Sequence, residues 1–280
     1  MDLSIFLAVL LAAALHAGWN TLLKSGGDPF LSIAHMTICA ACVSALLLPL
    51  VSAPVAAAWP WLAASAAIHM AYRFALIGMY RAGDLGQVYP IARGAAPLLT
   101  AIITLVAIGE RLSANGYLGI ALLACGVVLG SLKGGRLGTL EPRAVSLALL
   151  TACFTAGYSF VDGYGARVNG SGPSFAIWMF FVNAVTMLPV QLAMRGREIA
   201  ASFRSGWKLA LGATLISELA YFIAIWAMTV APIALVAALR ETSVLFAALF
   251  SVLLLGEPLT RWRSLAALAI VAGMMMLRFA

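Results

Sequence analysis

The sequence contains few charged residues. Of its 280 residues only 10% are Asp, Glu, Lys or Arg, whereas 64% are hydrophobic. A soluble domain of this size could not present such a composition to water, because its surface needs charge to stay dispersed. The composition therefore excludes a soluble globular protein and predicts a protein of the lipid bilayer.

Histidine and cysteine are also scarce. The histidines His16, His35 and His69 fall in three different apolar segments, and the sequence has neither a His-Glu-x-x-His pattern nor a nucleophile elbow. All four cysteines lie in apolar segments, where thiols usually act as small packing residues. Cys39 and Cys42 have a metal-like spacing but no accompanying ligand cluster. We therefore expect no catalytic site, metal or cofactor, and a membrane-embedded enzyme is the disfavoured alternative.

What the sequence does contain is a series of long apolar segments. A transmembrane helix needs about 20 mostly apolar residues, and every spanning segment must satisfy its own backbone hydrogen bonds in lipid. We therefore predict an all-α integral membrane protein with ten transmembrane helices. The predicted spans are 3–23, 30–51, 58–80, 85–108, 114–131, 144–165, 173–194, 207–229, 232–255 and 262–279.

One stretch of the sequence occurs twice. A shift of 147 residues matches eight positions without a gap, among them Arg93 with Arg240 and Glu110 with Glu257. The largest hydrophilic break, 133–143, divides the spans into five and five, so we expect a first half over 1–132 and a second over 144–280. Because each half has an odd number of spans, the second must enter the membrane from the opposite side, which makes the halves an inverted repeat.

The positive charge is spread over the short connections, with a net charge of +7. This spread concerns membrane orientation and predicts no nucleic-acid partner. The loops that follow odd-numbered spans carry eleven Lys and Arg residues, whereas the loops that follow even-numbered spans, together with the termini, carry three. This bias places the loops after odd-numbered spans in the cytoplasm and both termini outside. The first 20 residues carry Asp2 and no Lys or Arg before the apolar run, so we read them as an uncleaved span.

The doubled pattern resembles a known family. Its elements are a helix of small residues, Gly109-Glu110-Arg111-Leu112-Ser113, Gly119 and Gly126-Val-Val, repeated as Gly256-Glu257-Pro258-Leu259 and Gly273. It is similar to the EamA-type half-unit of the drug/metabolite transporter superfamily. The stretches Tyr80–Gly94 and Ala238–Ser243 also look like a subgroup found with phosphonate-utilisation genes. The resemblance implies a carrier that works by alternating access, with a cavity formed mostly by spans one, three, four, six, eight and nine.

Ionisable residues inside the predicted spans are candidates for function, because each costs roughly 2.5 to 3.5 kcal/mol to insert. Arg93 and Arg240 each precede their Gly-Glu turn by 16 residues, about 24 Å of helix. Because the two turns face opposite sides, we expect the arginines near opposite ends of the pore, as gating or entry cations. Glu241 points about 100° away from Arg240 and needs another cation, which its first-half counterpart, Gly94, cannot supply.

Two further groups lie opposite each other in the repeat. Matching Ala71-Tyr72 to Ala220-Tyr221 places His69 opposite Glu218, both near the middle of a span. Such a pair is a candidate for proton coupling, and the alternative is a static polar bridge between helices. Arg73 could pair with Asp84 or extend to the cytoplasmic surface. Trp19, Asn20, Tyr89, Tyr158 and Tyr221 are candidate pocket residues, although aromatic side chains on inward faces also serve packing.

Together these features predict a secondary transporter in the bacterial cytoplasmic membrane. Its cargo would be a small polar metabolite such as an amino acid, organic anion or phosphonate, because arginines bind carboxylate and phosphonate groups well. Glu110 and Glu257 are expected to serve structure in their turns. A lipid-linked sugar flippase of the same fold is the alternative, and the sequence leaves a homodimer open.

Overall fold

The computed structural model describes residues 1–23, 27–82, 85–130, 141–255 and 261–280. Most of the residues in these ranges are helical, and none of them forms a strand. The helices are α1 (Leu3–Leu23), α2 (Pro29–Leu47), α3 (Trp59–Ala82), α4 (Leu85–Ile108), α5 (Ala114–Gly130), α6 (Pro142–Asn169), α7 (Gly172–Val230), α8 (Ile233–Arg240), α9 (Ser243–Leu255) and α10 (Arg261–Arg278), with short 3₁₀ turns at Leu48–Leu50 and Ala56–Ala58.

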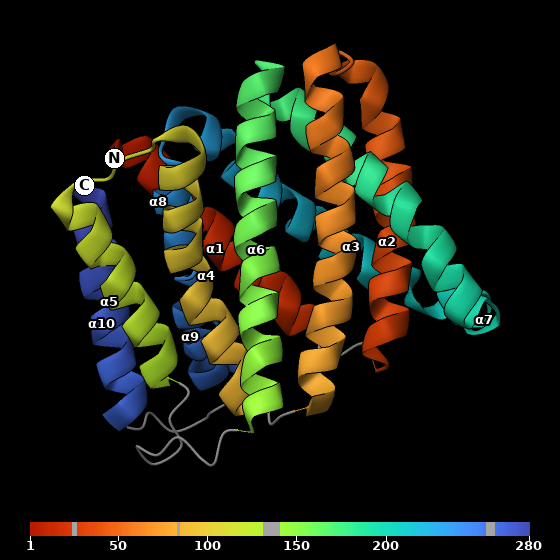
Figure 1. Ribbon diagram of the computed structural model, residues 1–280. Helices are drawn as coiled ribbons and strands as arrows, with labels where there is room; N and C mark the ends of the chain where they lie inside the picture. The colour runs from red at the N-terminus through yellow and green to blue at the C-terminus, as the bar shows by residue number, and fades with distance from the viewer. Residues whose placement is uncertain (24–26, 83–84, 131–140, 256–260) are drawn as a thin grey trace.

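The helices form a bundle of apolar spans (Figure 1). Seven helical stretches in the described residues are long and apolar enough to cross a membrane, and two shorter apolar helices, Ala114–Gly130 and Ser264–Arg278, accompany them. Helices suit this role because each backbone N–H finds a carbonyl within its own segment, without water. The prediction of an all-helical integral membrane protein is confirmed. The predicted connection 133–143 lies mostly outside the described residues, and α6 begins at Pro142.

Helix α7 differs from the prediction of two spans joined by a loop. It is helical from Gly172 to Val230 except at Arg195, whose φ of −143° and ψ of 38° are not helical. Figure 1 shows two limbs of α7 meeting at a turn at the edge of the molecule. The guanidinium of Arg195 lies 2.7 Å from Asp28 Oδ2 and also contacts Glu198, one turn further along. The predicted loop over 195–206 was therefore wrong, since these contacts confine the turn to one residue.

The predicted span over 232–255 is interrupted in the middle. α8 ends at Arg240 and α9 begins at Ser243. Between them, the N–H groups of Glu241 and Thr242 donate to the carbonyl groups three residues earlier, at distances of 3.0 and 3.1 Å. Backbone that departs from a regular helix at membrane depth is tolerated where protein surrounds it or it lines a cavity.

Helix α4 contains a comparable irregularity in the first half of the chain. It runs through two internal prolines, Pro90 and Pro97. Because proline has no backbone N–H, Pro97 leaves the carbonyl of Arg93, four residues earlier, without its usual helical donor. Both arginines singled out by the repeat thus lie where their helix is locally interrupted.

Close packing of small residues joins α5 to α10, which lie side by side at one edge of the bundle (Figure 1). A Cβ atom added at Gly273 would lie 2.8 Å from the carbonyl oxygen of Gly119, and one at Gly126 would lie 2.6 Å from Ile270. Glycine at these positions lets the two backbones approach, which is how many membrane helices associate. In the interior, α3 and α4 pack against α6, and α1 packs against α7, α8 and α9.

Candidate functional site

A buried ion pair inside the bundle joins the two halves of the chain. Arg93 of α4 and Glu241, between α8 and α9, form an ion pair with Nε 2.8 Å from Oε2, and their side chains are only 12% and 6% exposed. The same guanidinium donates from Nη2 to the hydroxyl of Ser243, the first residue of α9, at 3.2 Å. The Nε–H does not point at Oε2, so this carboxylate oxygen has no directed donor among the described residues. Glu241 therefore has a counter-ion and unused hydrogen-bonding capacity.

This contact overturns the prediction that Arg93 and Arg240 lie near opposite ends of a pore. Both line one small cavity, together with Glu241. α4 has 24 residues, and along the helix axis each arginine lies within about 6 Å of the middle of its span. The bounds of α4 agree with the predicted span 85–108. The inference was wrong because about 24 Å counted from the Gly-Glu turn passes the middle of a helix of this length by only about 6 Å. The cation that Glu241 needs comes from Arg93, the residue immediately before Gly94.

Arg240 is held differently from Arg93. Its guanidinium carbon lies 4.6 Å from the centre of the Tyr221 ring, within the range of a cation–π interaction. Among the described residues no ion pair joins it to a carboxylate. Arg240 is therefore the cation of this cavity with the most remaining capacity to bind an anion.

A second polar cluster adjoins the first and centres on Asp162 of α6, whose side chain is fully buried. Asp162 Oδ2 lies 2.9 Å from Nε2 of His69 on α3, and it accepts a hydrogen bond of 2.6 Å from the hydroxyl of Tyr221 on α7. Asp162 Oδ1 is buried with no hydrogen-bond partner in the part of the chain that the structure describes. A carboxylate so enclosed retains a free acceptor for a proton or a donor.

The structure replaces the predicted pairing of His69 with Glu218. His69 meets Asp162, because α3 packs against α6. Glu218 lies within electrostatic range of Cys39 on α2, and its buried Oε1 has no hydrogen-bond partner among the described residues. Positions matched by a repeat occupy equivalent places in each half, which does not oblige them to face each other. Asp162 is the only carboxylate in its span, and this could have marked it as the partner.

Tyr158 connects the two clusters. Its ring stacks on that of His69, with centroids 4.4 Å apart, and it lines the cavity that Arg93, Arg240 and Glu241 share. It precedes Asp162 by four residues, so both side chains lie on one face of α6. The cavity has a volume of about 10 Å³, and its remaining lining is Ala96, Pro97, Thr100, Thr155, Ser159 and Ala237. Such a volume holds about one water molecule, so cargo requires the surrounding helices to move.

The other predicted pocket residues lie near these groups or along α1. Tyr89 lies beside Arg93, with its ring centre 5.9 Å from the guanidinium. The indole N–H of Trp19 donates to Nδ1 of His16 at 3.3 Å, and the side-chain amide of Asn20 donates to the His16 carbonyl. Arg73 has a buried Nη1 with no hydrogen-bond partner among the described residues, and its predicted partner, Asp84, lies outside them.

A separate ion pair joins the end of α6 to the α4–α5 turn, close to a pocket that Met1 and Ala280 line. Arg167, near the end of α6, donates to Glu110 Oε1 at 3.0 Å and to the carbonyls of Met228 and Ala231, each at 2.8 Å. Glu110 thus helps to join the α4–α5 turn to the α7–α8 connection. Its expected structural role stays a prediction, and Arg167 was considered in the sequence only for its charge.

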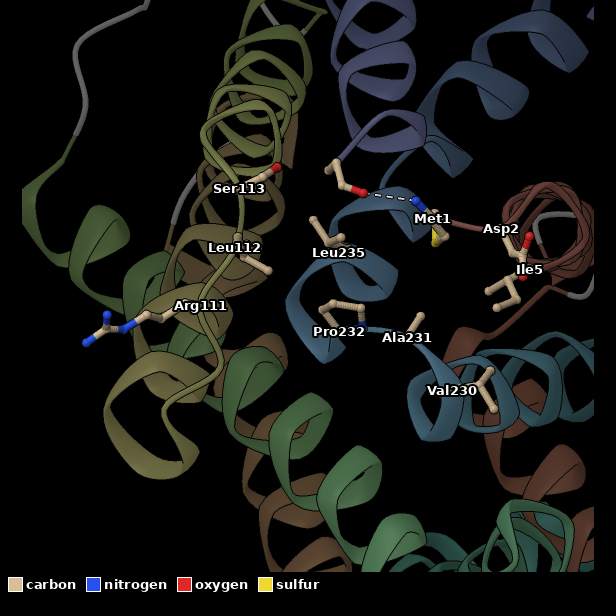
Figure 2. A pocket seen from close by; sticks show the side chains of 11 residues that line it. Met1, Asp2, Ile5, Arg111, Leu112, Ser113, Val230, Ala231, Pro232 and Leu235 are labelled. Atoms are coloured by element: carbon tan, nitrogen blue, oxygen red, sulfur yellow. Dashed lines mark hydrogen bonds between the residues drawn. The ribbon is translucent and has the colours of Figure 1, made fainter.

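A larger pocket, of about 260 Å³, opens beside this ion pair. Figure 2 shows that Leu112 and Leu235 face each other across it, whereas the side chain of Arg111 extends away. The pocket is therefore largely apolar in its middle and separate from the buried charges. No group of three or more His, Cys, Asp or Glu side chains that could hold a metal ion occurs among the described residues.

Comparison with known proteins relates this architecture to a family. Residues 142–279, which begin with α6 and run to the end of α10, match the model of the EamA-like transporter family. The chain belongs to this family. The EamA resemblance of the doubled Gly-Glu pattern is thereby confirmed, and the chain is a membrane transporter of the drug/metabolite type.

The fold of the whole chain resembles that of a solved structure. A solved structure titled only as a crystal structure of a protein aligns over 99% of this chain and 96% of its own length, with a TM-score of 0.77. At 19% identity this likeness concerns the fold alone. No curated protein matches the sequence. The class of cargo must therefore be inferred from the buried charges of the bundle.

Proposed function

We propose that the chain is a secondary transporter of ten transmembrane spans, arranged as two inverted repeats of five. This count takes the two limbs of α7 as two spans and α8 with α9 as one. The packing of the helices supports the repeat. In a repeat of five spans, α6 corresponds to α1 and the second limb of α7 corresponds to α3. The contact between α3 and α6 in the structure is matched, as the repeat requires, by a contact between α1 and α7. Likewise α4 corresponds to the α8–α9 pair, and the contact between α4 and α6 is matched by the contacts of α1 with α8 and α9. Inverted repeats of this kind place the substrate site near the middle of the bilayer.

The proposed cargo is a small metabolite with a carboxylate or phosphonate group, such as an amino acid or organic anion. The observation that carries this proposal is the convergence of Arg93 and Arg240 on one buried cavity, with Glu241 the carboxylate among its lining residues. Guanidinium groups bind planar oxyanions through two parallel hydrogen bonds. Burying an arginine in a bilayer is costly, so two in one cavity favour a role in binding over a role in packing.

Transport would proceed by alternating access in the bacterial cytoplasmic membrane. The cavity of about 10 Å³ represents a closed conformation, and the backbone interruptions at Pro97 and at Glu241-Thr242 are the places where α4 and the α8–α9 pair can bend. We assign to the Glu110–Arg167 ion pair the role of closing the cavity toward the side of the membrane where the termini lie. The distribution of Lys and Arg places that side outside the cell.

The test is uptake into proteoliposomes together with thermal unfolding in detergent. L-alanine, L-lactate and methylphosphonate are compared with neutral analogues of similar shape: L-alaninamide, L-lactamide and dimethyl methylphosphonate. A ligand that binds the folded state raises the unfolding temperature, and we expect this only from compounds with a free oxyanion.

Variants of the two arginines decide whether the cavity is the site. Arg93→Ala and Arg240→Ala are each expected to weaken binding roughly ten- to hundredfold, because a hydrogen bond to a charged group contributes about 1.5 to 3 kcal/mol. Arg204→Ala removes an exposed arginine of α7 and serves as the matched control. Unchanged transport in both cavity variants would remove the support for an anionic cargo.

A further inference from the structure

We propose that the His69–Asp162 pair binds one proton for each net negative charge that the cargo brings into the adjacent cavity. The inference rests on the proposed function, because it assumes an anionic cargo at Arg93 and Arg240. It makes Asp162, in place of Glu218, the partner of His69 in the coupling site. It also makes the coupling depend on cargo charge.

The first step is the charge of the buried cluster without cargo. Two guanidinium groups, Arg93 and Arg240, face two carboxylates, Glu241 and Asp162. With a neutral His69 the sum is zero, which is the arrangement of lowest cost in a medium of low dielectric constant. Lactate, with one negative charge, upsets this balance, whereas zwitterionic alanine does not.

The second step is the path by which the two sites sense each other. The guanidinium carbon of Arg240 lies 4.6 Å from the centre of the Tyr221 ring. The hydroxyl of Tyr221 donates a hydrogen bond of 2.6 Å to Asp162 Oδ2. On the other side, Tyr158 lines the cavity and stacks on His69. Cargo that draws Arg240 away from Tyr221 would therefore act directly on the hydrogen bonds of Asp162.

The third step is the identity of the proton acceptor. Asp162 Oδ1 is fully enclosed and has no hydrogen-bond partner among the described residues, and Oδ2 already contacts His69 Nε2. A proton entering this pair gives either an imidazolium facing a carboxylate or a neutral acid facing an imidazole, and in both cases the cluster gains one positive charge. Because the two groups are in direct contact, the proton is assigned to the pair.

The other titratable groups around the pair come from every helix that packs near it. His16 of α1 lies within electrostatic range of Arg93 and Arg240, and a further cation there would be repelled by both guanidinium groups. The phenols nearest the cluster are those of Tyr72, Tyr89, Tyr158 and Tyr221. No ion pair or hydrogen bond joins Arg73 or Glu218 to the cluster in the described part of the chain.

The experiment counts protons by calorimetric titration of the protein in detergent, at pH 7, in two buffers of different ionisation enthalpy. L-lactate and L-alanine are the probes, since they differ by a hydroxyl in place of an ammonium. We expect uptake of about one proton with lactate and none with alanine. Across pH 6.5 to 7.5, lactate affinity should fall about tenfold per pH unit, and alanine affinity should stay constant.

Two variants test the assignment. Asp162→Asn and Glu241→Gln each remove one negative charge, so each should bind lactate without proton uptake. Should Asp162→Asn fail to fold, Glu241→Gln still tests the charge balance. Lactate binding to the parent protein without proton uptake, or uptake that persists in Asp162→Asn or in Glu241→Gln, would overturn the proposal. If lactate, alanine and methylphosphonate all fail to bind, the proposed function itself fails and the inference falls with it.

Discussion

Replacing Glu241 by Gln changes one charge at the point where both halves of the chain meet. In the parent protein the Glu241 carboxylate occupies the guanidinium of Arg93, with Oε2 2.8 Å from Nε. An anionic cargo must displace this carboxylate or share the guanidinium with it. Glu241→Gln keeps the size of the side chain and removes the competing charge. We therefore expect L-lactate to bind more tightly to the variant.

The magnitude depends on the burial of the pair. Two unit charges about 4 Å apart attract each other by about 4 kcal/mol at an effective dielectric constant of 20. Desolvation offsets part of this attraction, and a hydrogen bond to a charged group contributes about 1.5 to 3 kcal/mol net. Removal of the competitor should therefore lower the lactate Kd roughly ten- to hundredfold. Without ligand the variant should be less stable by about 3 to 5 kcal/mol, because Arg93 is left buried without its counter-ion.

Isothermal titration of L-lactate measures the affinity, and thermal unfolding measures the stability. Glu198→Gln is the matched control: its carboxylate also pairs with an arginine but is 56% exposed on α7. This control should leave lactate affinity unchanged. An unchanged or weaker affinity in Glu241→Gln would refute the reasoning, because it would show that Glu241 does not compete with the cargo for Arg93.

Three further substitutions test the packing and the outer contacts. Gly273→Ala should lower the free energy of unfolding by about 1 to 3 kcal/mol, because the added Cβ would lie 2.8 Å from backbone atoms of α5. Gly212→Ala is the control, since position 212 has open space around it and the substitution should not lower the stability. Thermal unfolding measures both variants. Arg195 holds the pKa of the Asp28 carboxyl below its ordinary value through a hydrogen bond. The ionised carboxylate of Asp28 therefore stabilises the fold at pH values above its ordinary pKa of about 3.9. The unfolding temperatures of Asp28→Asn and the parent should converge as the pH falls through the lowered pKa, and a constant difference would contradict this. Glu110→Gln should increase the access of a thiol reagent to a cysteine introduced near the α7–α8 connection, because it weakens the contact with the guanidinium on α6, and unchanged access would speak against a role in closure.

The sequence predicted the helices well because apolar length determines what can cross a bilayer. It was less informative about where helices are interrupted. The turn at Arg195 depends on Asp28, 167 residues earlier in the chain, and no local pattern contains that contact. The interruption after Arg240 accompanies contacts of Arg93 with Glu241 and Ser243 on either side of it.

The candidate site was predicted in its residue types and only partly in its pairings. Arg93, Arg240, Tyr158 and Tyr221 lie together, whereas the sequence predicted the two arginines near opposite ends of the pore. The depth of a residue can be counted along one helix, but its neighbours depend on how the helices rotate and cross. For that reason the sequence could place His69 near the middle of its span without identifying Asp162 as its partner.

The ion pair between Arg93 and Glu241 has a consequence for how cargo is oriented. In the proposed repeat the two arginines are equivalent by descent, and a symmetric cavity would accept an anion equally well in two opposed poses. Glu241 has no acidic counterpart, because the matching position in the first half is Gly94. It neutralises one arginine and leaves the other facing the Tyr221 ring. Although the two halves of the chain are related by a two-fold repeat, their shared cavity is therefore asymmetric in charge. An asymmetric cargo molecule would bind in one orientation only, with its anionic group at one of the two arginines.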